Sequence, residues 1–375
     1  MHTWIEIDLD AVRANYMQAC MLSNARITAV LKSNAYGHGA VQIAHLLEEC
    51  GCTSFAVSCM REALELRRHD IHSDILVMGT CDEKESLQGV EQDITLSASS
   101  FLTLKNAAYA SEKLGKNAIV ELKVDTGFHR LGFPADHDCL TEAAEWIRQH
   151  PGLAVRGMYS HLGLISEELD RKQNERFLEA FHVFEESGLR IPEKHLCDSI
   201  GLVRYPQWHY DRVRIGAFLF GVRPSRSDHM PFQDLETLCL KAAVIQLHSV
   251  HKGEAVGYSD DMVMERDSRI ATISVGYGDG YPRMLSNGRG SALIRGRRCP
   301  VVGLVCMDQM MVDVTDVPDA AEGDTAVLLG KGISLNEYSD WAQTNRNECL
   351  ARLGSRPVRQ YFSGGRCISM HDALA

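Results

Sequence analysis

Residues 27–31 read ITAVL and run directly into KSNAYGHG at residues 32–39, which places a short apolar strand before a polar turn. Residues 40–50 follow as an amphipathic helix, because their apolar side chains recur at the three- and four-residue spacing of one helix face. These apolar side chains belong to Ala40, Ile43, Ala44 and Leu47. The stretch therefore predicts a strand–turn–helix unit, and the rest of the fold follows from its repetition.

The same alternation of strand and helix continues along the chain as far as about residue 220. The further expected strands are residues 54–58, 75–79, 94–98, 118–124, 154–159, 195–199 and 213–218. The further expected helices are residues 60–68, 101–114, 139–148 and 171–187. Eight strands alternating with helices predict a (β/α)8 TIM barrel. A doubly wound open sheet gives a similar alternation, but it would rarely use eight units so evenly.

The alternation stops after residue 237, where short apolar runs are separated by turns containing Gly, Asp and Pro. This composition is typical of a mostly β domain. Its expected strands are residues 240–250, 268–274, 291–294, 301–305, 311–314 and 325–329, with a short helix at residues 334–343. We therefore expect an α/β chain in which a TIM barrel is followed by a mostly β C-terminal domain.

Charge and hydropathy exclude two classes of partner. The chain has 375 residues and a formal net charge of −11, whereas nucleic-acid binding usually needs a basic face. No apolar run approaches the roughly 20 residues of a membrane span. The first ten residues, MHTWIEIDLD, contain acids where a signal peptide has an apolar core. We expect no nucleic-acid partner, no membrane partner and a cytoplasmic location.

The twelve cysteines include no Cys-x-x-Cys pair, which argues against a structural zinc site. Cys50 and Cys52 are too close in sequence for an ordinary disulfide, and Cys59, Cys239 and Cys306 stand in apolar, strand-like stretches. We expect reduced, mostly buried thiols and no metal site.

The first barrel strand leads into Lys32, at the end of the strand where barrels of this kind carry their functional side chains. A buried lysine is costly unless it is paired or reacting. Lys32 could form a Schiff base with an aldehyde, and loss of solvent would lower the pKa of its free amine. It could equally extend to solvent, and its position alone leaves both interpretations open.

Residues 31–39, LKSNAYGHG, closely resemble the cofactor-lysine motif of the alanine racemase family. Residues 4–9, WIEIDL, are similar to the N-terminal strand of that family, and further matches in the same order continue to Tyr361. The resemblance covers nearly the whole chain. It implies a pyridoxal 5'-phosphate cofactor held in the barrel.

The resemblance also implies an activity and an assembly. A small amino acid, L-alanine, would be converted to its D form by two acid/base groups in a homodimer with shared active sites. Residues 11–236 would form the cofactor-binding barrel. Residues 1–10 and 237–375 would form the mostly β domain that contributes the second catalytic base and the dimer interface.

The residues carried over from the family begin on the early strands. Lys32 would bind the cofactor and act as one acid/base group, and Tyr36 would hydrogen-bond its phosphate. Residues 124–132, VDTGFHRLG, resemble a family motif in which Arg130 contacts the cofactor phenolate and the substrate carboxylate. Without the family, an exposed loop arginine would be the favoured interpretation. Lys123 stands at a position that many members carbamylate, and a carbamate here would orient Arg130.

The later strands end in further matching residues, which are His161, His195, Ser199 and Arg214. By resemblance, Ser199 and the backbone of Gly216 and Ala217 would complete the phosphate cradle. His161 would pack against the cofactor ring, although a lone histidine is more often a satisfied core residue. Arg214 would lie beside the pyridine nitrogen. An arginine has no acceptor, so it would leave that nitrogen unprotonated and favour return of the proton to Cα.

The expected β domain carries a motif at residues 275–283, VGYGDGYPR, which resembles the family motif whose first tyrosine is the second catalytic base. That tyrosine is Tyr277, although a glycine-rich turn with a stacking tyrosine would be favoured in isolation. Racemisation requires a proton to leave one face of Cα and return on the other. Lys32 and Tyr277 on opposite faces would meet this requirement, with Tyr277 reaching the lysine of the other subunit.

Two further motifs follow in the same domain. Residues 303–309, GLVCMDQ, resemble a family segment that crosses the dimer interface, in which Met307 would help to bind the substrate carboxylate. Residues 356–361, RPVRQY, resemble the C-terminal motif whose tyrosine, Tyr361, would cap the phosphate and narrow the pocket.

Four positions depart from the commonest family pattern. Asp198 stands for an asparagine, Ile215 for a proline and Phe220 for a tyrosine, and residues 162–166 lack an acid that is usual at the entrance. None of these is a proton-transfer group. Asp198 would add a negative charge near the phosphate.

Three alternatives remain open at this point. Residues 197–202 and 281–287 look like the serine racemase branch, although the ring of Tyr361 would leave less room for a hydroxymethyl group and so favours alanine. A barrel-type amino-acid decarboxylase would share Lys32 but would not need Tyr277. A non-catalytic pyridoxal-phosphate carrier would be a barrel alone.

Overall fold

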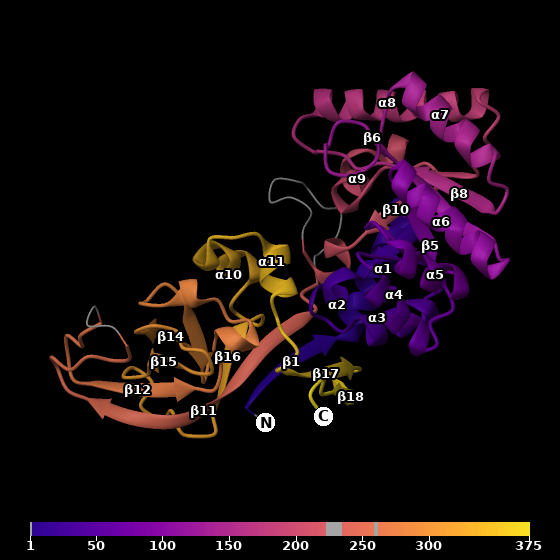
Figure 1. The fold of residues 1–375 in the computed structure, drawn as a ribbon. Helices are drawn as coiled ribbons and strands as arrows, with labels where there is room; N and C mark the ends of the chain where they lie inside the picture. The colour runs from indigo at the N-terminus through magenta and orange to yellow at the C-terminus, as the bar shows by residue number, and fades with distance from the viewer. Residues whose placement is uncertain (1, 223–234, 259–261) are drawn as a thin grey trace.

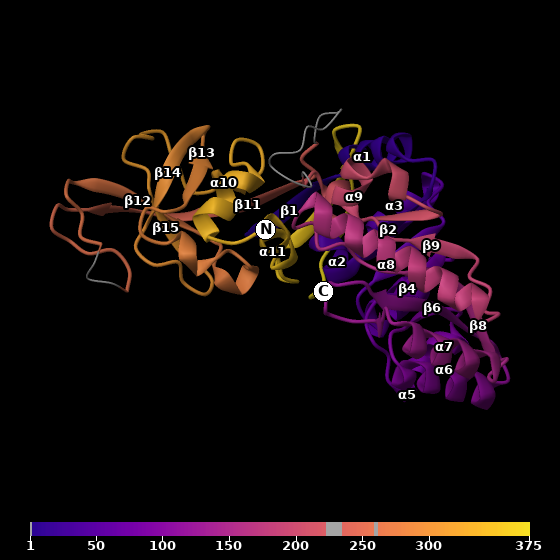
Figure 2. The same ribbon diagram turned by 90° about the horizontal axis from the view of Figure 1, so that it is seen from above.

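Two sheets organise the chain, and they lie at opposite ends of the molecule (Figure 1). The computed structural model describes residues 2–222, 235–258 and 262–375. Met1 and residues 223–234, which fall within the expected units at 1–10 and 11–236, lie outside the described residues. The long strand β11 (Leu238–Val250) leads from the barrel side into the second sheet, as the turned view shows (Figure 2).

The first sheet is a barrel of parallel strands. Its members are β2 (Arg26–Val30), β3 (Ser54–Val57), β4 (Asp74–Val77), β5 (Thr95–Ala98), β6 (Ala118–Asp125), β8 (Leu153–Tyr159), β9 (Glu193–His195) and β10 (Arg212–Ile215), in the order β10-β2-β3-β4-β5-β6-β8-β9. The ring closes between β9 and β10, where the Asp211 amide donates to the Lys194 carbonyl at 3.0 Å and the Arg214 amide donates to the Cys197 carbonyl at 3.1 Å. The predicted TIM barrel is confirmed.

Burial on both faces explains the apolar runs in the barrel strands. Every residue of β3, β5 and β10 is buried, as expected for parallel strands covered by side chains inside and by helices outside. Strand β3 pairs with β4 in parallel register from Ser54 opposite Asp74 to Val57 opposite Val77. Because all strands run the same way, the residues that follow them gather at one end of the barrel.

Helices cover the outside of this barrel. They are α1 (Leu9–Leu22), α3 (Ala40–Glu49), α4 (Met60–Arg68), α5 (Glu83–Glu91), α6 (Phe101–Leu114), α7 (His137–Arg148), α8 (Glu167–Glu186) and α9 (Ser199–Arg204). Helix α8 begins before the predicted residue 171 because the Ser166 hydroxyl accepts from the Leu169 amide at 3.3 Å and caps it. Short segments complete this part: β7 (Phe133–Pro134), α2 (Lys32–Tyr36), η1 (Pro206–Trp208) and η2 (Ala217–Phe220).

Two of the predicted barrel strands end three or more residues earlier than expected. The strand predicted at residues 195–199 stops at His195, because the Asp198 carboxylate accepts from the Ile200 and Gly201 amides at 2.9 and 3.0 Å and starts helix α9. The strand predicted at residues 213–218 stops at Ile215, because the chain turns at Gly216 into the 3₁₀ segment η2.

The second sheet is mostly antiparallel and confirms the predicted β domain. Its order is β12-β15-β14-β13-β16-β11-β1-β17-β18, and β1 pairs antiparallel with β11 and parallel with β17. The strands are β1 (Thr3–Asp8), β12 (Ser268–Ile273), β13 (Ser291–Ile294), β14 (Arg297–Val302), β15 (Met310–Asp313), β16 (Thr325–Leu329), β17 (Val358–Ser363) and β18 (Arg366–His371). Two 3₁₀ turns lie between β12 and β13, η3 (Tyr277–Asp279) and η4 (Arg283–Leu285).

Two helices lie between the second sheet and the barrel (Figure 1). Helix α10 (Leu335–Ala342) corresponds to the predicted helix, and the Ser334 hydroxyl caps it by accepting from the Glu337 amide at 3.2 Å. Helix α11 (Arg346–Ala351) was not predicted, and it packs against α2 at the mouth of the barrel.

The described chain contains no disulfide, and all twelve cysteines are free. Among the described residues, the structure has no helix with both the length and the apolar character needed to cross a membrane.

Candidate active site

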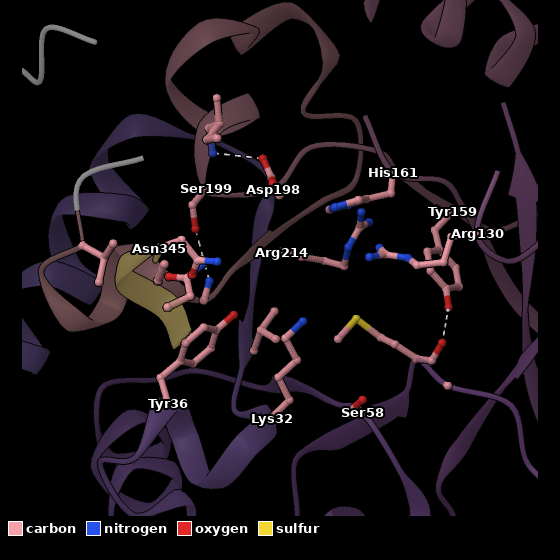
Figure 3. A pocket seen from close by; sticks show the side chains of 18 of the residues that line it. Lys32, Tyr36, Ser58, Arg130, Tyr159, His161, Asp198, Ser199, Arg214 and Asn345 are labelled. Atoms are coloured by element: carbon pink, nitrogen blue, oxygen red, sulfur yellow. Dashed lines mark hydrogen bonds between the residues drawn. The ribbon is translucent and has the colours of Figure 1, made fainter. Parts of the chain in front are cut away.

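A cavity of about 460 Å³ lies at the carboxyl ends of the barrel strands (Figure 3). It brings together most of the residues that the sequence singled out, although they come from segments far apart in the chain. These are Lys32, Tyr36, Lys123, Arg130, His161, Ser199, Arg214, Gly216 and Ala217.

Lys32 and Tyr36 reach the cavity from a left-handed turn. The four residues from Ser33 to Tyr36 have φ between 52° and 54°, which costs non-glycine residues roughly 1–2 kcal/mol each. The turn is held by its own backbone, since the Gly37 amide donates to the Ser33 carbonyl at 3.0 Å. The Glu62 carboxylate also accepts from the Ser33 amide at 2.7 Å. Both side chains point from this turn into the cavity (Figure 3).

A residue of the second sheet holds this turn by a hydrogen bond on the side away from the cavity. Arg359 on β17 is 1% exposed, and its guanidinium donates to the Gly37 carbonyl at 2.9 Å. The same guanidinium donates to the Gly354 carbonyl at 2.9 Å, so it joins the turn to the segment before β17. His38 adds a second link, because its Nε2 lies 2.8 Å from the Thr237 hydroxyl. The geometry of Lys32 therefore depends on both sheets.

The environment of Lys32 makes its amine easier to deprotonate. Burial lowers the pKa of Lys32, and the nearby Arg130 guanidinium lowers it further, whereas Glu62 and Asp198 partly oppose the shift. A larger fraction of the amine is therefore neutral near pH 7 than for a free lysine, and the neutral amine is the form that attacks an aldehyde.

One end of the cavity is built to receive an oxyanion. Tyr36, Ser199 and Asn345 lie together there (Figure 3), and the Ser199 hydroxyl accepts from the Gly216 amide at 3.2 Å. A side chain at Gly216 would place its Cβ 2.5 Å from the Tyr36 hydroxyl oxygen, so only glycine leaves this space free. Burial, with a smaller contribution from Asp198, raises the pKa of Tyr36 to about 12, which keeps its hydroxyl available as a donor.

The opposite end of the cavity gathers cations. Arg214 is 4% exposed and donates to the Ser160 carbonyl at 2.7 Å, while Arg130 is exposed and stacks its guanidinium 4.3 Å from the Phe128 ring centre. The Lys123 amine lies 4.4 Å above the Tyr159 ring centre. Burial and the cations Arg214, Lys123, Arg130 and Lys32 lower the pKa of His161 well below its usual range, so this imidazole stays neutral.

Asp198, the unusual acid noted in the sequence, lies on the cavity wall and caps helix α9. Burial raises the pKa of its carboxyl, although two backbone amides and Arg214 oppose that shift. Among the described lining residues Asp198 is the one acid, whereas five are lysines or arginines: Lys32, Lys123, Arg130, Arg214 and Arg346. The cavity as a whole therefore favours an anionic ligand.

Several lining residues escaped the sequence analysis, and they are Val30, Ser58, Met78, Gly79, Leu131, Tyr159, Ile200, Val222, Asn345, Arg346 and Asn347. Ser58 and Tyr159 stand at the carboxyl ends of β3 and β8, so the barrel rule could have identified them. The segment from Asn345 to Asn347 comes from the other end of the chain, and no local pattern pointed to it.

Four of the residues carried over from the family are not among those that line the cavity, namely His195, Tyr277, Met307 and Tyr361. Tyr277 and Met307 are 43% and 54% exposed. Their motifs are neighbours, since the Tyr277 amide donates to the Cys306 carbonyl at 3.0 Å and the Gly278 amide donates to the Met307 carbonyl at 2.8 Å. The two side chains therefore belong to one surface region.

Tyr361 lies behind the left-handed turn. It is fully buried, and its hydroxyl donates to the Gln42 side-chain oxygen at 3.1 Å. A Cβ at Gly39 would come within 2.0 Å of this hydroxyl, so the ring packs directly against the chain that follows the turn. In this arrangement the ring supports the turn, and the predicted role of Tyr361 in capping the phosphate and narrowing the pocket stays a prediction.

Comparison with known proteins identifies the family. The model of the alanine racemase N-terminal domain matches residues 7–224, and the model of the alanine racemase C-terminal domain matches residues 237–361. This chain belongs to the alanine racemase family.

Individual relatives agree with the family match over almost the whole length. The alanine racemase of Methanococcus maripaludis is 36% identical over 370 residues, which is 96% of this chain and 98% of the relative. Alanine racemase 1 of Caldanaerobacter subterraneus subsp. tengcongensis is 36% identical over 97% of this chain and 95% of its own length. The solved alanine racemase structure from Clostridium difficile 630 has a TM-score of 0.95 at 28% identity, covering 100% of this chain and 99% of the other.

Proposed function

We propose that this member of the alanine racemase family interconverts L-alanine and D-alanine with pyridoxal 5'-phosphate as its cofactor. The observation that carries the proposal is the position of Lys32, whose amine points into a cationic cavity at the carboxyl end of a TIM barrel. The family match over both domains supports the same activity.

The cavity fits the cofactor on its own chemistry. Tyr36, Ser199 and the backbone of Gly216 and Ala217 would bind the phosphate at the oxyanion end. Lys32 would bind the aldehyde, with His161 beside the ring. At the cationic end, Arg130 would contact the phenolate oxygen and the substrate carboxylate, and Arg214 would face the ring nitrogen. The cofactor supplies, when bound, an electron sink that acidifies the Cα–H bond of an amino acid.

Racemisation further needs acid/base groups on both faces of Cα. We propose that the Lys32 amine removes or returns the proton on one face, and that the Tyr277 hydroxyl does so on the other. The described chain offers Tyr277 at an exposed site outside its own cavity, which favours its use in a second subunit. Met307 is exposed beside Tyr277, so it would enter the same site of the second subunit and help to bind the substrate carboxylate there.

This arrangement implies a homodimer with two shared active sites. We propose that residues 11–236 form the cofactor-binding unit, and that residues 1–10 with 237–375 supply the second base and the dimer interface. The pairing of β1 with β11 and β17 supports this division. We further propose that the enzyme works in the cytoplasm on a small-molecule substrate.

Substrate choice is the first test of the proposal. The relatives reported above are named alanine racemases, which favours alanine over the serine alternative. We expect kcat/KM of the holoenzyme in a chiral assay to be at least about 10-fold higher for L-alanine than for L-serine, because a site adapted to alanine would leave the added hydroxyl group of serine without a partner. A higher value for L-serine would reverse this assignment.

Two further measurements separate the proposal from the other two alternatives. A decarboxylase would release CO2 from its substrate. A non-catalytic carrier would leave the Cα proton of alanine unexchanged in deuterated water. Racemisation with Cα exchange and without CO2 release is the expected result.

We also propose that Lys123 is carbamylated. Burial, together with the Arg214 and Arg130 guanidinium groups, lowers the pKa of Lys123 to about 7. Its amine is therefore largely neutral above this pH, and only a neutral amine reacts with CO2. The product would be an anion between two arginines, which replaces an unfavourable cation with a favourable charge.

Carbon-13 NMR can test this modification. With labelled bicarbonate, we expect a carbamate carbonyl signal that grows as the pH rises through about 7 and disappears in Lys123→Arg. The exposed Lys172, which pairs with Glu168 at 2.7 Å, provides the control, and Lys172→Arg should retain the signal. A wild-type spectrum with no carbamate signal above that pH would exclude the modification.

A further inference from the structure

A fully buried group of charged residues lies inside the barrel next to Arg214. Glu121 on β6, His195 on β9 and Arg212 on β10 are each at most 1% exposed. The Glu121 carboxylate contacts both partners, with its Oε2 2.7 Å from His195 Nε2 and its Oε1 against the Arg212 guanidinium. Arg212 is also paired with Glu193, at 2.9 Å from Nε to Oε2. A buried network of this kind rigidifies the core when its members are hydrogen-bonded.

The charges of His195 and Glu121 at neutral pH follow from the shifts in their pKa values. Burial lowers the pKa of His195 to about 3, assisted by Arg212 and Arg214 and opposed by Glu121. Burial raises the pKa of Glu121, but its contacts with His195 and Arg212 outweigh burial and bring it to about 2. At neutral pH the histidine is therefore neutral and the glutamate is ionised.

A neutral imidazole carries one N–H, and its neighbours decide which nitrogen holds it. An ionised carboxylate can only accept, so the Glu121 oxygen at 2.7 Å requires the proton on Nε2. Arg212 Nη2 also lies 3.1 Å from Nε2 and could donate to a bare nitrogen there. In that alternative tautomer the proton would sit on Nδ1 and face the Arg214 guanidinium, which can only donate. The Nε2–H tautomer gives both the Glu121 carboxylate and the Arg214 guanidinium a matching hydrogen-bond partner on the ring.

With the proton on Nε2, His195 Nδ1 becomes an acceptor that faces Arg214. Arg214 Nη1 lies 2.5 Å from it, and the same nitrogen lies 3.2 Å from the His195 carbonyl. Arg214 Nη2 donates to the Ser160 and Leu196 carbonyls at 2.7 and 3.0 Å. The imidazole is thus the side-chain acceptor that holds the guanidinium on the cavity wall.

We propose that Glu121 is a positioning residue for the reaction, because it fixes the His195 tautomer that holds Arg214 toward the cofactor ring nitrogen. The position of the cofactor in this inference rests on the proposed function, but the assignment of the His195 tautomer does not. Loss of the Glu121 acceptor would allow His195 to turn its N–H toward Arg214 and displace the guanidinium. The ring nitrogen would then be free to gain a proton, and transamination would compete with racemisation.

Histidine nitrogen-15 NMR of the holoenzyme tests the first step without any change to Glu121. We expect the His195 signals, assigned by their loss in His195→Gln, to report a neutral ring protonated at Nε2. A ring protonated at Nδ1, or at both nitrogens, would overturn the proposal. This measurement remains decisive even if the wild-type enzyme racemises no amino acid.

Substitutions test the second step. In Glu121→Met, which has similar length but no acceptor, we expect the ratio of pyridoxamine phosphate formed to alanine racemised to rise above that of the wild type, because Arg214 would no longer be held toward the ring nitrogen. In Glu121→Gln, the amide oxygen can still accept from Nε2–H, so the ratio and the tautomer should stay near wild type. Glu193→Gln is the matched control, because Glu193 pairs with Arg212 but not with His195.

Either of two results would contradict the proposal. One is a Glu193→Gln ratio that rises as much as that of Glu121→Met, which would show a general loss of packing. The other is an unchanged ratio in Glu121→Met with the guanidinium still in place. If Glu121→Met fails to fold, Glu121→Gln decides, since a raised ratio with an unchanged tautomer would also overturn the proposal.

Discussion

Replacing Lys32 with alanine is expected to lower kcat/KM for alanine racemisation by at least roughly 10²-fold, because a positioned acid/base group is usually worth that much. The same change removes the amine that would hold the cofactor, so the cofactor absorbance should also be lost on dialysis. The fold should survive, since Lys32 is half-buried and faces the cavity, where truncation leaves water in its place.

Lys113→Ala is the control for this change. Lys113 lies on the outer surface and donates to the Tyr109 hydroxyl at 3.1 Å, far from the proposed chemistry. Its loss should leave kcat/KM and cofactor binding unaltered. Racemase activity within a factor of a few of wild type in Lys32→Ala would remove Lys32 from the proposed mechanism.

Replacing Tyr277 with phenylalanine is expected to lower kcat/KM by a similar factor, at least roughly 10²-fold, while leaving cofactor binding intact. The ring and its packing remain, and only the hydroxyl that would carry a proton is lost. Tyr258 is an exposed tyrosine in the same domain, at 84% exposure, and Tyr258→Phe is the matched control.

A mixture of the two variants shows where Tyr277 acts. A dimer of one Lys32→Ala subunit and one Tyr277→Phe subunit would contain one site with both groups and one site with neither, if the tyrosine comes from the partner. Unfolding and refolding the two variants together in equal amounts should then restore about a quarter of wild-type activity, because half of the dimers are mixed and each has one working site. If Tyr277 served its own subunit's cavity, no activity would return.

The barrel could be predicted from the sequence because its strands are buried on both faces and therefore read as apolar runs. The predicted ends were less accurate where a polar side chain intervenes, as Asp198 does by starting α9. Strand β18 (Arg366–His371) gave no signal, since all six of its residues are exposed at the edge of the sheet. Helix α11 is short and has a mixed composition, and its place is set by packing against α2.

The residues of the candidate site also divide into those that the sequence predicts and those that it does not. Lys32, Tyr36 and Ser199 follow barrel strands and Arg214 lies near the end of β10, so topology alone brings them to one end of the barrel. Asn345 arrives from helix α11, and its approach to the cavity depends on tertiary packing that no local pattern encodes. Glu121 looked like an ordinary strand residue, and only the three-dimensional contacts with His195 and Arg212 give it a role.

The hydrogen bond between Arg359 and the Gly37 carbonyl of the left-handed turn has a consequence for folding during synthesis. Residues 32–36 leave the ribosome long before Arg359 does, yet the guanidinium that holds their carbonyl end belongs to the last part of the chain. A nascent barrel would therefore carry Lys32 and Tyr36 on a loosely held turn. Lys32 would therefore reach its final geometry only near the end of synthesis, and we expect binding of the proposed cofactor to follow the folding of the C-terminal segment that carries Arg359.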